Sequence, residues 1–149
     1  MPIIWDKEKV KSILPQREPF LFVDDVIELQ EGHRIVARIY LDPAADFFKG
    51  HFPGNPVMPG VLTIEAMAQA GILVYVTARP DIVKKNPEYY FGSVNAKFRS
   101  PAYPGETLIL EAEIFKVANF GGVVDTKARV GDRLVAEARS IFAVKVKDE

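Results

Sequence analysis

Hydrophobic and polar residues alternate along much of the chain, and this pattern predicts a protein built largely from strands. Residues 107–117 place Glu111 and Glu113 on one face and apolar side chains on the other. Further strands are predicted at 20–29, 33–41, 91–98, 122–130 and 133–146, the last two joined by a tight turn at Gly131-Asp132. Strands with one apolar and one polar face are typical of an antiparallel sheet that has one face in water.

One long apolar segment, residues 61–78, interrupts this pattern. As a helix it would extend roughly 27 Å, close to the length of a membrane span. Glu65 and Gln69 lie within it and strands follow soon after, so we expect a buried helix and no membrane span. A short helix is predicted at 6–14 and a Pro- and Gly-rich loop at 42–60. A sheet wrapped around one buried helix is the economical arrangement, because each then covers the apolar face of the other.

The composition is that of an ordinary globular domain. The chain has 149 residues, of which 48% are hydrophobic and 26% charged, and no repeat or linker divides it, so we predict one domain over 1–149. A formal net charge of −1 without a basic tract gives no sign of a nucleic-acid partner. The absence of cysteine and of a secretion-signal pattern fits a reducing, cytoplasmic location.

Two residues suggest acid–base chemistry. His51 lies in a loop whose glycines and prolines restrict the backbone, and rigid placement suits a histidine that acts as a base near neutral pH. Glu65 is the one charged residue in the apolar segment 61–78. Burial favours the protonated form of a carboxyl group, which could then act as a general acid. The alternatives are a structural loop histidine and a glutamate that faces solvent.

The start of the predicted helix offers a third element. Pro59-Gly60 leaves the first backbone N–H groups unpaired, where they could stabilise negative charge on a carbonyl oxygen, although an ordinary helix start explains the same dipeptide. Base, acid and oxyanion donors together would remove a proton next to a carbonyl and expel a hydroxyl group from the neighbouring carbon. With two histidines and no cysteine, no zinc site is expected.

At these residues the sequence resembles a known family. GHFPGNPVMPGVLTIEAMAQ (50–69) resembles the active-site stretch of the (3R)-hydroxyacyl-[acyl carrier protein] dehydratases of bacterial fatty acid synthesis, the FabZ type. The segments ILPQREPFLFVDDV and YYFGSVNAKFRSPAYPGETLILEAEIFK resemble that family on either side. The resemblance implies an α+β hot-dog fold, in which a bent antiparallel sheet wraps around one long central helix. It also implies that no cofactor is needed. The implied assembly is a homodimer, which can assemble further into a hexamer made of three dimers.

The resemblance also implies the roles of three residues. His51 takes the α-proton of a 3-hydroxyacyl thioester, and Glu65 of the partner subunit assists the loss of the hydroxyl group as water. The amide of Gly60 polarises the thioester carbonyl. The product is a trans-2-enoyl thioester.

Binding residues follow from the same resemblance. An acyl tunnel at the dimer interface is expected near Phe52, Met58, Tyr90 and Phe91, although plain core packing would explain the same residues. Lys97 and Arg99 are expected to dock the acidic acyl carrier protein, and a pair of solvated charges is the alternative.

The chain departs from the family pattern in its N-terminal segment. Where the family usually has Leu-Pro-His-Arg-Tyr-Pro-Phe, residues 14–20 read LPQREPF, with Gln16 in place of the histidine. This difference leaves local packing and the substrate range open. Asp25 stands where a basic residue is common, which bears on carrier docking. Glu65 differs from the Asp of the related dehydratase-isomerases, so isomerase activity is not expected.

Three alternatives stay open at this point. A hot-dog acyl thioesterase could use Glu65 to direct water, although it would not need His51. A non-catalytic acyl-binding protein could keep the tunnel. A dehydratase of polyketide or other secondary lipid synthesis would use the same chemistry. The acyl chain length, and the choice between carrier protein and coenzyme A, do not follow from the sequence.

Overall fold

The computed structural model describes residues 2–146. Six antiparallel strands form one sheet in the order β1-β2-β4-β5-β6-β3. The strands are β1 (Asp25–Gln30), β2 (Arg34–Tyr40), β3 (Pro87–Phe98), β4 (Thr107–Ala118), β5 (Gly121–Val130) and β6 (Arg133–Val146). The helices are α1 (Lys7–Ile13), α2 (Asp46–Gly50), α3 (Gly60–Ala78) and the 3-10 turn η1 (Ile82–Lys85).

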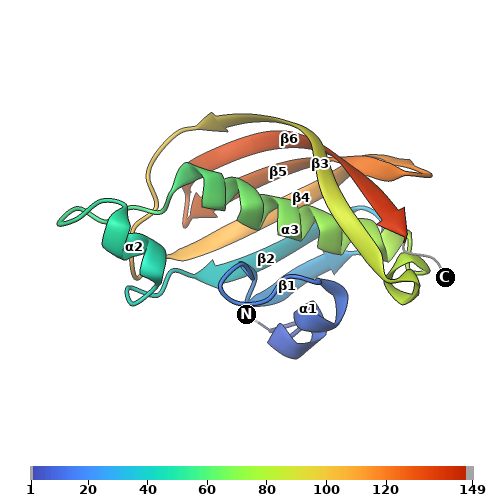
Figure 1. Ribbon diagram of the computed structural model, residues 1–149, viewed down its shortest axis with the longest axis horizontal. Coiled ribbons are helices and arrows are strands. Elements are labelled where there is room, and N and C mark those ends of the chain that lie inside the picture. Colours follow the sequence, from blue (N-terminus) through green and yellow to red (C-terminus); the bar gives the residue numbers. More distant parts are fainter. Residues whose placement is uncertain (1, 147–149) are drawn as a thin grey trace.

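The sheet curves around α3, which crosses its inner face (Figure 1). By length and hydropathy α3 could span a membrane, but most of that apolar stretch is buried within the fold. It is apolar around nearly its whole circumference, so only a layer that curves about it can cover it. The predicted α+β arrangement, with one central helix inside a bent antiparallel sheet, is confirmed.

Alternate residues of the strands form the core under α3. On β2 and β4 most of the predicted inward positions are buried, and the outward positions include the charged residues Arg34, Arg38, Glu111 and Glu113. Each fully buried Leu or Ile contributes about 1.5–3 kcal/mol. The inward residues of these two strands and the turn after β2 are Ile35, Ala37, Ile39, Leu41, Leu108, Leu110 and Ala112.

Ion pairs cross the outer face of the sheet. Glu111 on β4 accepts hydrogen bonds from Arg34 on β2 and Arg129 on β5, and Asp125 pairs with Arg139. Burial alone would raise the pKa of Glu111, but the bonds from Arg129 and Arg34 outweigh it and lower that pKa. These pairs join neighbouring strands on the face that α3 does not cover.

Three predicted boundaries were wrong. Residues 20–24 are not strand, because the N–H of Phe22 and the carbonyl of Phe20 bond to the side chain of Gln69 on α3, although Asp24 makes a backbone hydrogen bond to Arg38 of β2. The predicted loop at 42–60 contains the short helix α2. Strand β3 begins at Pro87, four residues before the predicted start at 91, because residues 87–90 pair with β6.

We predict that Gly71→Ala destabilises the protein. A Cβ at this position would lie 2.8 Å from Cγ2 of Val124 on β5, so α3 and the sheet would have to separate. Overpacking of this kind costs about 1–3 kcal/mol, against a gain of about 1 kcal/mol in helix propensity. Denaturant unfolding of Gly71→Ala, Val124→Ala and the double variant measures the effect. If the two single changes in the free energy of unfolding simply added up in the double variant, the contact between position 71 and Val124 would be contradicted.

Candidate active site

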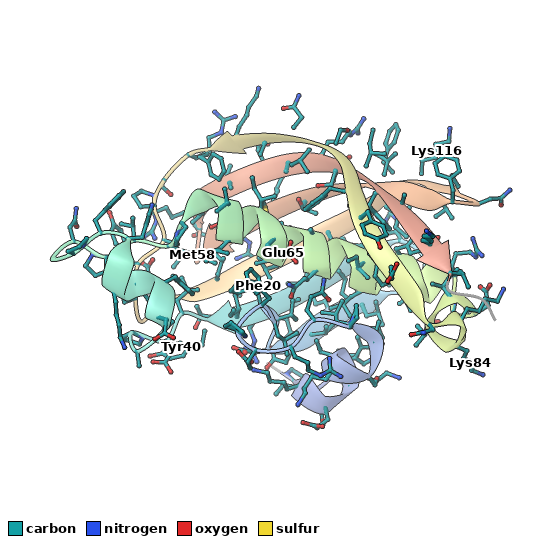
Figure 2. All side chains as sticks on the ribbon, viewed as in Figure 1. Phe20, Tyr40, Met58, Glu65, Lys84 and Lys116 are labelled. Carbon is teal, nitrogen blue, oxygen red and sulfur yellow. The ribbon has the colours of Figure 1, made fainter. Side chains whose placement is uncertain are left out.

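Glu65 lies in the second turn of α3, where its side chain is half-buried. Figure 2 shows it beside the N-terminal segment that contains Phe20. Its Oε2 atom accepts a hydrogen bond from Nε2 of Gln69, one turn further along the helix, at 2.9 Å. One carboxylate oxygen is therefore held by the protein, and Oε1 has no hydrogen-bond partner within residues 2–146.

Gln69 holds this part of the site together. It is completely buried, and its Nε2 also donates to the carbonyl oxygen of Phe20 at 2.7 Å. Its Oε1 accepts from the backbone N–H of Phe22 at 2.8 Å. Both N–H groups and the oxygen of the amide are thus in use. From the sequence Gln69 was recognisable only as a polar residue in the helix. Its position one turn after Glu65 was the signal that could have identified this role.

A cavity of about 60 Å³ opens beside Glu65. Ala68 and Ile72 of α3 form one wall, and Tyr90 and Phe91 of β3 form another. Its volume is far below the roughly 300 Å³ at which pockets for small molecules begin. Gln16, Tyr89 and Ser140 also line the cavity, so it is small and its walls are partly polar.

His51 follows α2 directly and is held by its own loop. Its Nδ1 lies 3.1 Å from the carbonyl oxygen of Val57, and the N–H of Val57 donates to the carbonyl of His51 at 2.8 Å. Because a carbonyl only accepts, Nδ1 carries the proton and Nε2 keeps the lone pair that a base needs. The ring of Phe52 stacks on the imidazole at 4.0 Å between centroids.

The start of α3 presents backbone donors. The N–H groups of Leu62 and Thr63 donate to the carbonyl of Pro59. Those of Gly60 and Val61 have no acceptor in the described part of the chain. A Cβ on Gly60 would lie 2.9 Å from Cε1 of Phe98, so glycine permits this close approach between α3 and the end of β3.

The predicted site residues fall into two groups within one subunit. Glu65, Tyr90 and Phe91 line the same cavity, whereas His51 and Phe52 belong to the loop after α2 and do not line it. The hydroxyl of Tyr90 donates to Glu88. Met58 is only 5% exposed and packs in the hydrophobic core, so its contact with an acyl chain stays a prediction.

Lys97 and Arg99, the predicted docking residues, lie on the outer face of the sheet. They line a groove that contains side chains of both signs, including Glu137 and Asp125. Arg99 bonds to Glu137 at 2.9 Å. The groove is separate from the cavity beside Glu65, and its charges largely balance.

The fold is the predicted hot-dog fold. A solved structure of this architecture, the dehydratase heterocomplex ApeI:P from Xenorhabdus doucetiae, has a TM-score of 0.77 at 16% identity, and the match covers 93% of this chain and 91% of that one. At this identity the likeness shows the fold alone.

Sequence comparison shows the family. The FabA-like domain matches residues 14–139, so the chain belongs to the FabA-like family. The 3-hydroxyacyl-[acyl-carrier-protein] dehydratase FabZ of Symbiobacterium thermophilum is 46% identical over 133 residues, covering 89% of this chain and 92% of that protein. The bifunctional enzyme LpxC/FabZ of Chlorobaculum tepidum is 39% identical over 145 residues; the match covers 97% of this chain, which spans 31% of that longer protein. The resemblance to FabZ-type dehydratases is confirmed over most of the chain.

We predict that Gln69→Leu lowers the free energy of unfolding by about 1–3 kcal/mol, because it leaves the N–H of the buried Phe22 and the carbonyl of Phe20 without their partner. Chemical denaturation measures the loss. Gln30→Leu, at an exposed position on β1, is the matched control and should change stability by less than about 0.5 kcal/mol. Equal stability of the two variants would show that the Gln69 amide does not hold the segment.

Proposed function

We propose that the chain converts (3R)-3-hydroxyacyl-[acyl carrier protein] to trans-2-enoyl-[acyl carrier protein] in fatty acid synthesis. The observation that carries this proposal is Glu65, whose carboxyl group is held by Gln69 and lines a small cavity. The sequence relatives support the same reaction class. They are 3-hydroxyacyl-[acyl-carrier-protein] dehydratases, and their similarity to this chain covers nearly the whole length of each relative. The proposed reaction uses side-chain and backbone groups and requires no cofactor.

In this mechanism His51 is the base and Glu65 is the acid. Nε2 of His51 takes the α-proton, and the electrons of that C–H bond form the new double bond to the β-carbon. The bond from the β-carbon to its hydroxyl oxygen breaks as Glu65 donates a proton, and water leaves. The N–H of Gly60 stabilises the negative charge that develops on the thioester oxygen. Proton exchange then returns His51 and Glu65 to their starting states.

The complete site requires a homodimer. In the proposed dimer His51 of one subunit works with Glu65 of the partner subunit, and the separation of His51 from the cavity that Glu65 lines within one subunit supports this arrangement. Strand β3 supports this assembly, because it is a twelve-residue strand at the edge of the sheet and carries exposed apolar side chains at Phe91 and Phe98. An edge of this kind pairs readily with another strand. A hexamer stays a prediction.

The substrate enters as a thioester on the acidic acyl carrier protein, in the cytoplasm. Lys97 and Arg99 are the proposed docking residues, and Lys97 has its ammonium group exposed on the outer face of β3. The negative charge of Asp25 does not act alone against the acidic carrier protein, because Arg38 on β2 binds its carboxylate through two hydrogen bonds of 2.8 Å. The acyl chain passes from His51 and Phe52 toward Tyr90 and Phe91, and Met58 supports this path from the core.

We predict that His51→Ala and Glu65→Gln each lower the rate of dehydration by about 10²–10⁴-fold. The assay follows the appearance of the conjugated enoyl thioester from (3R)-hydroxyacyl-carrier protein. His33→Ala is the matched control, because His33 is the other histidine and lies on the outer face beside Glu113. Its rate should equal that of the parent.

Other results of this assay would replace the proposal. Release of a free thiol without enoyl product would identify a thioesterase. Binding of acyl carrier protein without either product would identify a non-catalytic binding protein. Activity only on substrates of secondary lipid or polyketide synthesis would move the same chemistry to another pathway.

We predict that the two inactive variants complement each other. In a mixed dimer of His51→Ala and Glu65→Gln subunits, one of the two shared sites has both wild-type residues. After equal mixing about half of the dimers are mixed, so activity should return to about a quarter of the parent value. No recovery, with mixed dimers shown by mass spectrometry, would place both residues in one subunit's site.

A further inference from the structure

The cavity beside Glu65 contains polar atoms that the protein leaves without partners. The hydroxyl oxygen of Tyr89 and Oε1 of Gln16 are both buried, and neither has a hydrogen-bond partner among residues 2–146. Both side chains line the cavity, together with the hydroxyl-bearing Ser140. Buried polar groups are nearly always paired, because an unpaired one costs stability. Two such atoms in one small cavity indicate that a ligand or water completes them.

Tyr89 lies toward the end of the cavity that is away from the start of α3. Helix α3 and strand β3 run in opposite directions, since Gly60 packs against Phe98 at one end. At the other end lies Tyr89, near the start of β3. Glu65, which would act at the β-carbon, is closer to the start of α3. Along the helix axis it is roughly 10 Å from Ile72, in the wall that leads toward Tyr89.

Both unpaired atoms have fixed surroundings. The loop that carries Gln16 is clamped by Arg17, whose guanidinium donates to the carbonyl oxygens of Leu14 and Gln16 at 2.8 Å. Tyr89 belongs to β3 and pairs with Val144 of β6. Burial raises the pKa of Tyr89 to about 12, so its phenol keeps its proton and donates at neutral pH. The apolar side chains of Ala68 and Ile72 line the same cavity.

We propose that the cavity selects acyl chains that carry a second oxygen, foremost a hydroxyl group toward the far end of the chain. The phenol of Tyr89 donates to that oxygen, and the hydroxyl group of the ligand donates to Oε1 of Gln16. A ligand hydroxyl is both a donor and an acceptor, so it pairs both buried atoms, whereas a plain hydrocarbon end leaves both unpaired. This inference rests on the dehydratase function proposed above and names the substrate class for the same site.

The test compares two (3R)-3-hydroxyacyl thioesters of equal chain length, one with a hydrocarbon end and one with a terminal hydroxyl group, over a graded series of lengths. The measured quantity is the ratio of kcat/KM for the two substrates. In Tyr89→Phe and Gln16→Met this ratio should fall about tenfold, which equals about 1.4 kcal/mol or one hydrogen bond. Both variants should keep their activity on the hydrocarbon substrate, and Tyr89→Phe should keep its melting temperature because it removes an unpaired group.

Tyr40→Phe is the matched control. Tyr40 is exposed on β2, near the opposite edge of the sheet from β3, and does not line the cavity (Figure 2). Its ratio should equal that of the parent. Unchanged ratios in Tyr89→Phe and Gln16→Met, with the hydrocarbon substrate still turned over, would assign the cavity to water and overturn this inference alone. Failure to dehydrate either substrate would overturn the proposed function and this inference with it.

Discussion

The structure depends on the burial of one helix that is apolar on almost every side. No flat sheet covers such a helix, so the six strands must bend around α3. The register of each strand is then set by the need to place its apolar side chains against the helix. Gly71 shows how tight the contact is, since Val124 leaves no room for a methyl group. The curvature of the sheet then brings β3 alongside the helix and creates the cavity between them.

Polar groups on such a helix need partners that the fold supplies at the right place. Gln69 is acceptable inside the core because its amide replaces the strand partners that Phe20 and Phe22 lack. The same amide binds Glu65, so the N-terminal segment, the helix and the candidate acid are connected through one side chain. The buried amide of Gln69 therefore also fixes the position of the Glu65 carboxyl group.

Much of the fold could be predicted from local patterns, and the site only in part. Alternation in 107–117 and the apolar stretch 61–78 predict the sheet and the buried helix, because each apolar residue favours burial whatever its distant neighbours are. The predicted start of the strand at 20–29 was wrong for a different reason. The backbone groups of Phe20 and Phe22 bond to the side chain of a residue almost fifty positions away. Likewise, no spacing could show that Tyr89 and Gln16 meet in one cavity, since three-dimensional contact decides it.

The position of β3 at the edge of the sheet also affects how safely the chain can exist alone. A long edge with exposed aromatic residues is a template for any extended chain, and misfolded neighbours compete for it as well as correct partners. Pro87 at one end and Lys97 near the other are the features that discourage such pairing. Self-association would therefore protect the protein from aggregation, and dilution would expose it to that risk.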